Sequence, residues 1–293
     1  MDFNKKGLSD LKGFLKKNIN QIKGESIGDI EPKSIPTKLF DFDNMTRGLR
    51  RGELIAFCGR PMMGKTSLAI QIAKNIAQVY NLPSFLFSFD ISKEDIAYKI
   101  ISMEAGIDAH HLRQGSITSK DLSVINQIIE EIEKLPIFIE DNKKITIDDI
   151  KIECRRIISE SKIQSLGLIA IDSYHMINFP DKGNYQNKEK NIIIDLKLLA
   201  EELDVPILVT GPISRDVENR VNPRPKLSDI LETDYLEKYS DIVAMIYRDE
   251  YYDPDTVDRG IAEIIVSKHK NGPLGTVKML FEPQYGRYRN LAA

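Results

Sequence analysis

The 293-residue sequence has few of the residues that build a metal centre, a disulfide framework or a membrane anchor. Its two cysteines, Cys58 and Cys154, have no metal-ligand spacing, so we expect buried apolar residues in a reducing compartment. No apolar stretch approaches the roughly 20 residues that a bilayer crossing needs. The lysine-rich N-terminus is not followed by the apolar segment of a signal peptide. We therefore expect a cytoplasmic protein with no membrane partner.

An excess of charge of one sign is also missing. The 41 Lys and Arg residues are nearly balanced by 44 Asp and Glu residues, which gives a net charge of -3. This balance excludes a protein that coats nucleic acid through a generally basic surface. It does not exclude a local basic channel, because the field at a site depends on where the charges lie. The length suits one large α/β domain or two small ones.

The most informative segment is a glycine loop between a short apolar run and an amphipathic segment. The loop fits the phosphate-loop pattern G-x-x-x-x-G-K-[ST] without a gap, and it consists of Gly59, Arg60, Pro61, Met62, Met63, Gly64, Lys65 and Thr66. Residues 53–58 have the character of a buried strand, and residues 67–77 have helical apolar spacing. A glycine turn that only begins a helix does not need a buried strand before it. Because both a strand and a helix flank the loop, we interpret it as a nucleotide site.

The residue types of this loop explain how it would hold a nucleoside triphosphate. Glycines let successive backbone N–H groups turn toward a phosphate, and the following helix adds a partial positive charge at its N-terminus. We expect Lys65 to reach the β and γ phosphates and Thr66 to hold a magnesium ion. The predicted nucleotide-binding residues are 59–67, which includes Ser67, and the predicted cofactors are ATP and Mg²⁺.

A second apolar run ends in a carboxylate that fits the same site. Residues 166–171 are all apolar or glycine, and Asp172 follows them. In phosphate-loop proteins a carboxylate at the end of such a strand binds the magnesium ion through water. The pattern alone is common, but together with the glycine loop it predicts Thr66 and Asp172 as the metal residues.

The order of the other elements predicts an α/β fold. Helices are expected at residues 93–105, 119–134, 146–160 and 191–203, with Thr146 as the cap of the third. Strands are expected at residues 53–58, 84–89, 136–140, 166–172, 205–210, 242–247 and 261–266. This alternation favours a mainly parallel sheet with helices on both faces and with the ligand at the carboxyl ends of the strands.

Residues 8–23 carry an amphipathic helical pattern with leucine and isoleucine at three- and four-residue steps. A polar, glycine-containing linker follows at residues 24–32. We assign residues 1–33 to a linker helix and linker, and residues 34–293 to an ATPase domain. The apolar stripe of the helix needs a cover, which is either its own domain or another subunit.

Several segments resemble the RecA-like motor domain of the DnaB-type bacterial and phage replicative helicases. The resemblance spans residues 34–291 and is carried by the glycine loop and by residues 34–37 (SIPT), 214–220 (SRDVENR), 224–229 (RPKLSD), 247–252 (YRDEYY) and 268–276 (KHKNGPLGT). It implies a RecA-like P-loop core and an ATP-driven hexameric ring that moves along single-stranded DNA. It also implies that residues 8–23 dock on a neighbouring motor domain. We expect no counterpart here of the family's separate N-terminal, primase-interacting domain.

The same resemblance implies four catalytic residues. Lys65 is one, and Asp90 stands where the family has a catalytic glutamate with one more methylene. Lys268 and Lys270 stand where the family acts on the γ-phosphate of a neighbouring subunit. Lys270 replaces an arginine finger, so it keeps the charge but lacks the planar fork that bridges phosphate oxygens.

Two further segments depart from the family pattern. Pro212 stands where the family has a phosphate-sensing glutamine, and proline has no side-chain donor. Leu231 replaces a basic residue in the family's DNA-facing loop, and Asp234 adds a negative charge that would repel a phosphate backbone.

Two functions remain open at this level. The first is a ring-forming, DNA-stimulated ATPase that drives a replicative helicase. The second is a helicase-like protein that binds ATP and acts as an assembly or regulatory partner of a true helicase, which the four departures favour. A RecA-fold ATPase of another process is a third alternative. In each case another replisome protein is a possible partner, and DNA-stimulated turnover would separate the first function from the second.

The remaining polar clusters carry weaker signals. His110 and His111 have no further ligand at metal spacing and fit a solvated helix start. His175 stands where the family has an amide side chain, which favours a hydrogen-bonding role over metal binding. A polar loop is expected at residues 180–190, either facing DNA or solvated, and its basic and aromatic residues are Lys182, Tyr185, Lys188 and Lys190.

Overall fold

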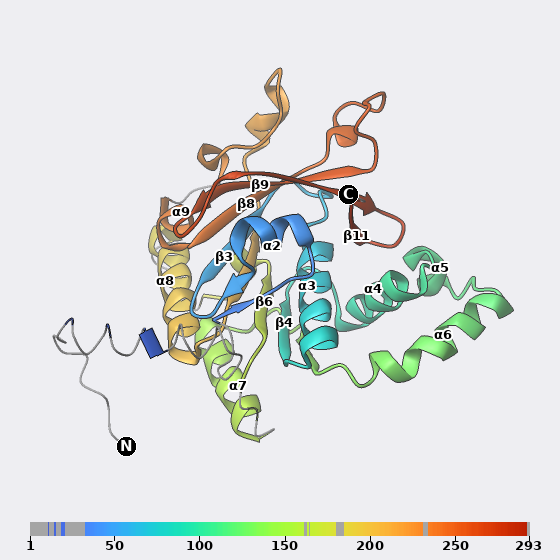
Figure 1. The fold of residues 1–293 in the computed structure, drawn as a ribbon, viewed down its shortest axis with the longest axis horizontal. Helices are drawn as coiled ribbons and strands as arrows, with labels where there is room; N and C mark the ends of the chain where they lie inside the picture. The colour runs from blue at the N-terminus through green and yellow to red at the C-terminus, as the bar shows by residue number, and fades with distance from the viewer. Residues whose placement is uncertain are drawn as a thin grey trace. The chain divides into compact units, whose positions relative to one another are not determined.

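The computed structural model describes residues 33–291, except 161–162, 164, 180–184 and 231–233, together with residues 11, 15, 19 and 20. The chain divides into two units, residues 1–34 and residues 35–293. In the second unit the described strands form a nine-stranded sheet of order β11-β10-β9-β8-β3-β7-β6-β4-β5 (Figure 1). The domain boundary at residue 34 stays a prediction.

Six neighbouring strands of this sheet run parallel, as the sequence predicts. They are β3 (Leu54–Cys58), β4 (Ser84–Ser88), β5 (Ile137–Glu140), β6 (Leu168–Asp172), β7 (Ile207–Gly211) and β8 (Ile242–Tyr247). All of them except β5, at the edge, are buried along their whole length. A strand that is covered on both faces of the sheet needs apolar side chains on both faces. This explains why the sequences of these strands are almost continuously apolar.

The other three strands extend the sheet in antiparallel fashion beyond β8. They are β9 (Ile261–His269), β10 (Gly275–Glu282) and β11 (Arg287–Asn290). β9 is three residues longer than the predicted strand, and β10 and β11 were not predicted. Because β9 runs against β8, its last residues lie beside Ile242, at the amino edge of the parallel strands.

Helices cover both faces of the parallel strands, which confirms the predicted layers. They are α2 (Phe40–Thr46), α3 (Lys65–Tyr80), α4 (Lys93–Ala105), α5 (Ala109–Gln114), α6 (Ser119–Ile132), α7 (Ile147–Glu160), α8 (Tyr185–Leu203) and α9 (Asp234–Tyr239). Two short strands, β1 (Ser34–Ile35) and β2 (Leu49–Arg50), form a separate sheet. Single 3₁₀ turns are η1 (Tyr174–Met176), η2 (Arg215–Asn219), η3 (Leu227–Asp229) and η4 (Asp249–Tyr251).

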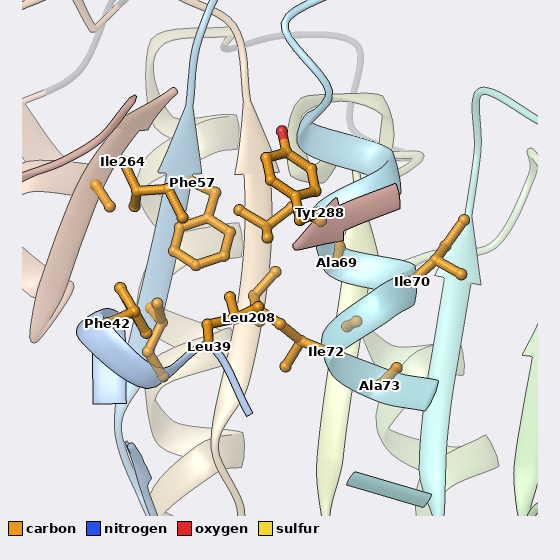
Figure 2. Close-up of a cluster of buried hydrophobic side chains, with 14 of the residues drawn as sticks. Leu39, Phe42, Phe57, Ala69, Ile70, Ile72, Ala73, Leu208, Ile264 and Tyr288 are labelled. Carbon is orange, nitrogen blue, oxygen red and sulfur yellow. The ribbon is translucent and has the colours of Figure 1, made fainter. Parts of the chain in front are cut away.

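Alternate residues of each strand point into two separate apolar cores. Phe57 of β3 packs with Phe42 of α2 and with residues of α3, including Ile72 (Figure 2). The neighbouring residue Ala56 faces the other core, which the apolar sides of α7 and α8 close. This alternation fixes β3 between two layers and therefore fixes the start of the glycine loop that follows it.

Helix starts mostly agree with the sequence. Thr146 accepts a hydrogen bond from the Asp149 N–H at 3.2 Å, which confirms it as the cap of α7. The expected loop at residues 180–190 is wrong in its second half, because α8 begins at Tyr185 and places Lys188 and Lys190 in its first turns. Residues 180–184 lie outside the described part of the chain, and so does Lys182.

Of the predicted helix at residues 8–23, only Leu11, Leu15, Ile19 and Asn20 belong to the described residues, where they are helical. The three apolar side chains are exposed, by 72%, 50% and 48%. The rest of this helix and its linker lie outside the described residues. Of the helices in the described part, none combines the length and the apolar character that a membrane span needs.

Candidate nucleotide site

The glycine loop follows a path that only glycine permits at two positions. A Cβ atom at Gly59 would lie 2.9 Å from the backbone oxygen of Ile246 on the neighbouring strand. Gly64 has φ +98°, and a Cβ atom there would lie 2.4 Å from the Tyr288 hydroxyl. Tyr288 itself lies against the start of α3 (Figure 2). The two glycines therefore let the loop leave β3 and enter α3 in close contact with its surroundings.

The other loop residues divide between surface and core. Pro61 and Met62 are exposed, with Met62 at 78%. Met63 is a core residue, exposed by only 1%, and its carbonyl oxygen accepts a hydrogen bond from the Tyr288 hydroxyl. Thr66 is half-buried and Ser67 is buried in the first turn of α3. The Met63 side chain therefore anchors the loop, and only its backbone can serve a ligand.

The Lys65 side chain folds over its own loop. Its Nζ donates hydrogen bonds to the carbonyl oxygens of Gly59 at 2.8 Å and Arg60 at 2.9 Å. Burial lowers the pKa of this amine, and the negative charges of Asp172 and Asp90 oppose that shift. The amine is therefore held against the glycine loop, near the carboxylates of Asp172 and Asp90.

Asp172 ends β6 and is buried beside Lys65. Its Oδ1 accepts a 2.5 Å hydrogen bond from the Thr210 hydroxyl on β7. Its Oδ2 is buried and has no hydrogen-bond partner among the described residues. A buried carboxylate oxygen without a partner is costly, and a water molecule held by a cation would satisfy it.

The donor set fits magnesium better than a protein-built metal centre. No cluster of three or more His, Cys, Asp or Glu residues that could hold a metal occurs in the described part of the chain. Mg²⁺ commonly takes one or two protein oxygens and completes its shell with water and substrate phosphates. Thr66 and Asp172 provide such a sparse set.

Asp90 lies at the same edge of the sheet as Asp172. It follows β4 by two residues, and β4 pairs with β6 so that Ser88 lies opposite Asp172. The Phe89 N–H donates to the Asp172 carbonyl oxygen at 2.7 Å, which holds the two strand ends together. Asp90 is exposed, and its charge acts on Lys65. The predicted carboxylate therefore lies at the sheet edge that carries the glycine loop, near enough for its charge to act on Lys65.

Lys268 and Lys270 lie at the opposite edge of the sheet. Lys268 pairs with Val243 near the start of β8, whereas Gly59 lies against Ile246 near the end of β8. The three residues from Val243 to Ile246 span about 10 Å along the strand. Lys268 donates to the Ser240 carbonyl oxygen at 2.7 Å and to that of Glu237. Burial and the charge of Lys270 lower the pKa of Lys268. Neither lysine lies beside the glycine loop of the same chain.

Lys270 and its neighbours form a charged cluster at that edge. Its Nζ lies 2.8 Å from Asp241 Oδ1, and Lys197 Nζ lies 2.7 Å from Asp241 Oδ2. Asp241 also accepts a hydrogen bond from the Leu54 N–H at 2.9 Å, so the cluster is fixed to the first residue of β3. Lys270 is exposed as a residue, and in this structure its ammonium is held by Asp241.

Sequence reasoning missed several residues that hold the site. Thr210 is the partner of Asp172, although nothing in the sequence distinguishes it from any other strand threonine. Lys99 of α4 lies beside Ser67 and Gly286, and burial and the charge of Arg113 lower its pKa. Arg248 donates to the Met62 carbonyl oxygen at 3.1 Å. Their positions depend on tertiary packing, and local spacing does not show it.

Ion pairs tie the loop to the segment after β7. The Arg60 guanidinium lies 2.8 Å from Glu218 of η2. Arg220 forms an ion pair with Asp229, and Arg224 pairs with Glu263 of β9 through two 2.9 Å hydrogen bonds. Residues 214–230 are therefore tied to the glycine loop through Glu218 and to β9 through Arg224.

The residues that depart from the family pattern and the two adjacent histidines lie in different parts of the chain. Pro212 directly follows β7 and is half-buried. Leu231 and the Asp234 side chain lie outside the described residues. His110 and His111 are exposed at the start of α5, whose cap is Asp108.

The sequence has close relatives with known names. It is 38% identical to the replicative DNA helicase DnaB of Geobacillus stearothermophilus over 90% of this chain and 58% of that protein. It is 37% identical to the replicative DNA helicase DnaC of Bacillus subtilis (strain 168) over 94% of this chain and 60% of that protein. The chain thus spans about three fifths of the length of these relatives.

Solved structures show the same fold. One solved chain, described as an ATPase domain, matches with a TM-score of 0.89 and 29% identity, over 98% of this chain and 100% of that one. A DnaB-like replicative helicase, described with its interactions with primase, matches with a TM-score of 0.86 and 29% identity, over 98% of this chain and 68% of that one. Residues 34–290 match the family described as DnaB-like helicase C terminal domain. The chain therefore belongs to the DnaB-like helicase C-terminal domain family, with a RecA-like α/β fold.

Proposed function

We propose that the chain is the ATP-hydrolysing motor domain of a replicative DNA helicase, which forms a ring and moves along single-stranded DNA. The supporting observation is that the glycine loop, the Lys65 amine and the unpartnered oxygen of Asp172 come together at the carboxyl edge of the sheet. The named relatives, which are replicative DNA helicases, support the process in which the motor acts.

Within this proposal, each site residue has one role. The backbone N–H groups of residues 59–67 hold the triphosphate, and Lys65 exchanges its bonds to Gly59 and Arg60 for the β and γ phosphates. Thr66 and Asp172 hold Mg²⁺, which neutralises charge on the phosphate oxygens when bound. Asp90 accepts the proton of the attacking water.

Lys268 and Lys270 act on the nucleotide of a neighbouring subunit. Their position at the amino edge of the sheet supports this role, because they cannot reach the glycine loop of their own chain. The proposal therefore requires an oligomer, and a hexameric ring is the arrangement that we propose. The exposed apolar side chains of Leu11, Leu15 and Ile19 support an interface through residues 8–23.

The nucleic-acid partner is single-stranded DNA. We assign its contacts to the start of α8, with Lys188 and Lys190, and to the segment that ends at Asp229, since both follow strands that end at the nucleotide edge. We also propose a further replisome protein as a partner and the cytoplasm as the location. Neither the fold nor the comparisons give support to the assembly-factor alternative.

The experiment that tests this function is ATP hydrolysis with and without single-stranded DNA, with Lys65→Ala as the blank. The proposal expects turnover that rises when DNA is added and an assembly larger than a monomer in a sizing run with ATP. Turnover equal to that of Lys65→Ala would remove the motor function and leave nucleotide binding. A strictly monomeric protein would remove the role of Lys268 and Lys270.

A further inference from the structure

His175 lies beside the nucleotide site but has no part in the proposed reaction so far. It belongs to η1, the turn that follows β6, three residues beyond Asp172. The residue is accessible to solvent at the carboxyl edge of the sheet. The charges of Lys65, Asp172 and Asp90 all act on its ring. These are the residues assigned above to the phosphates, the metal and the attacking water.

The hydrogen bonds around His175 determine which ring nitrogen carries the proton. The Ser173 hydroxyl lies 2.8 Å from the Thr210 carbonyl oxygen, which can only accept, so the single hydroxyl proton is used there. The same hydroxyl oxygen lies 2.8 Å from His175 Nδ1 and must therefore accept a hydrogen bond from it. Nδ1 thus carries the proton, and Nε2 keeps a free lone pair in the neutral ring.

The Nε2 atom is available as an acceptor. Among the described residues none forms a hydrogen bond with it, whereas Nδ1 is fixed by Ser173. Because Ser173 is bonded to Thr210, and Thr210 to Asp172, a chain of hydrogen bonds sets the ring position relative to the metal-side carboxylate. The ring is therefore oriented by groups of β6 and β7, on a residue that is exposed as a whole.

The charges around the ring keep it neutral. Partial burial lowers the pKa of His175 below its ordinary value of 6.5, and Lys65 of α3 and Lys188 of α8 lower it further. Asp172 of β6 and Asp90, after β4, act in the opposite direction but do not reverse the shift. At neutral pH the ring therefore accepts through Nε2, and it loses that ability when acid adds a second proton.

We propose that His175 is a water-positioning residue, whose Nε2 accepts a hydrogen bond from the water that attacks the γ-phosphate. The inference rests on the proposed ATPase function. The water oxygen bonds to the γ-phosphorus, and the bond from that phosphorus to the β–γ bridging oxygen breaks, with its electron pair leaving on ADP. The released water proton passes to Asp90 and from there to solvent or phosphate. Each of the two water hydrogens is then held by one acceptor, one by His175 Nε2 and the other by the Asp90 carboxylate.

A pH profile of turnover separates this role from a structural one. In the wild type, kcat falls as the pH drops through the pKa of His175, which lies below 6.5, because Nε2 becomes a donor. In His175→Gln the amide oxygen accepts at every pH, so this loss of kcat disappears while kcat at pH 8 stays within a few fold. In His175→Ala, kcat falls about tenfold to a hundredfold with little change in KM. The matched control is His110→Gln, which is exposed on α5 and keeps the wild-type profile.

A second measurement needs no turnover. The chain has four histidines, so long-range ¹H–¹⁵N spectra of the wild type and His175→Gln identify the His175 nitrogens. The inference requires a protonated Nδ1 and an unprotonated Nε2, and the opposite tautomer overturns it. An unchanged acid profile in His175→Gln overturns the water-positioning role alone. Wild-type turnover no higher than that of Lys65→Ala overturns the proposed function and this role together.

Discussion

Thr210 donates a 2.5 Å hydrogen bond to Asp172 across the boundary between β7 and β6. The bond occupies one carboxylate oxygen and leaves the buried Oδ2 without a partner, as the atom that would accept from a water of the proposed magnesium ion. Because the contact comes from a neighbouring parallel strand, the orientation of the carboxylate depends on sheet register. Thr210 is therefore a positioning residue for the metal side of the site.

Thr210→Val keeps the β-branched shape but removes this hydrogen bond. We expect the apparent affinity for Mg²⁺ in nucleotide binding to fall roughly tenfold, as for partners that orient metal ligands. The measurement is a magnesium titration at fixed ATP. Thr276→Val on the exposed part of β10 is the control and should leave the titration unchanged. Equal magnesium affinity in both variants would contradict the role of Thr210.

Gly64→Ala tests the close contact at the start of α3. The new Cβ atom meets the Tyr288 hydroxyl at 2.4 Å and must also adopt φ +98°. We expect the free energy of unfolding to fall by about 2–4 kcal/mol, from both the clash and the backbone conformation.

Gly115→Ala is the matched control for this variant. Gly115 also has positive φ, at +65°, but nothing lies within 4 Å of the place that a Cβ atom would take. It should lose only about 1 kcal/mol, which is the cost of the backbone conformation. Denaturant unfolding of both variants measures the difference. A loss for Gly64→Ala no larger than for Gly115→Ala would show that the Tyr288 contact does not constrain the loop.

Mixing two inactive variants tests whether Lys270 acts between subunits. Lys65→Ala should lose nucleotide contacts, and Lys270→Ala should bind nucleotide but hydrolyse it roughly a thousandfold more slowly if it acts as a cationic finger. In mixed rings, some interfaces pair an intact Lys65 with an intact Lys270, so turnover should partly return. Mixed samples with no more turnover than the separate variants would place Lys270 outside the reaction.

The Asp241 cluster predicts a dependence of stability on acid. Burial raises the pKa of Asp241, but hydrogen bonds from Lys197, Lys270 and the Leu54 N–H outweigh it, so the pKa lies below its ordinary 3.8. A lowered carboxylate pKa contributes stability that is present above pH 3.8 and is lost as the pH falls through the folded-state pKa. Asp241→Asn should cost about 3 kcal/mol at pH 7 and should flatten the acid loss.

Unfolding curves from pH 7 to well below pH 3.8 measure this effect. The control is Asp255→Asn, which changes an exposed aspartate in a turn and should keep the wild-type dependence. If Asp241→Asn and Asp255→Asn lose stability with acid in the same way, Asp241 does not hold the lysine cluster.

The sequence was sufficient for the parallel half of the fold and for the core of the site. Strands such as β3 and β6 are buried on both faces, so their apolar runs stand out, and the glycines at 59 and 64 leave a local pattern. Asp172 was predicted because it ends such a strand, whereas Asp90 was predicted from the resemblance to the helicase family. In these cases the local sequence carries the structural constraint.

The rest depends on contacts between distant parts of the chain. β10 and β11 lack a continuous apolar run, because only every second residue is buried, and β11 has a single buried residue. Thr210 and Lys99 look like ordinary strand and helix residues until packing brings them to the site. The placement of Lys268 and Lys270 at the far edge follows from the antiparallel direction of β9, which the residues themselves do not show.

Calorimetric titration with Mg-ATP tests the central claim most directly, because it detects binding whether or not hydrolysis follows. The account predicts saturable heat for the wild type, a strong loss of affinity in Lys65→Ala and a weaker complex when EDTA removes the magnesium. No binding heat in the folded wild type, or equal affinity in Lys65→Ala, would contradict a nucleotide site built from the glycine loop and Asp172.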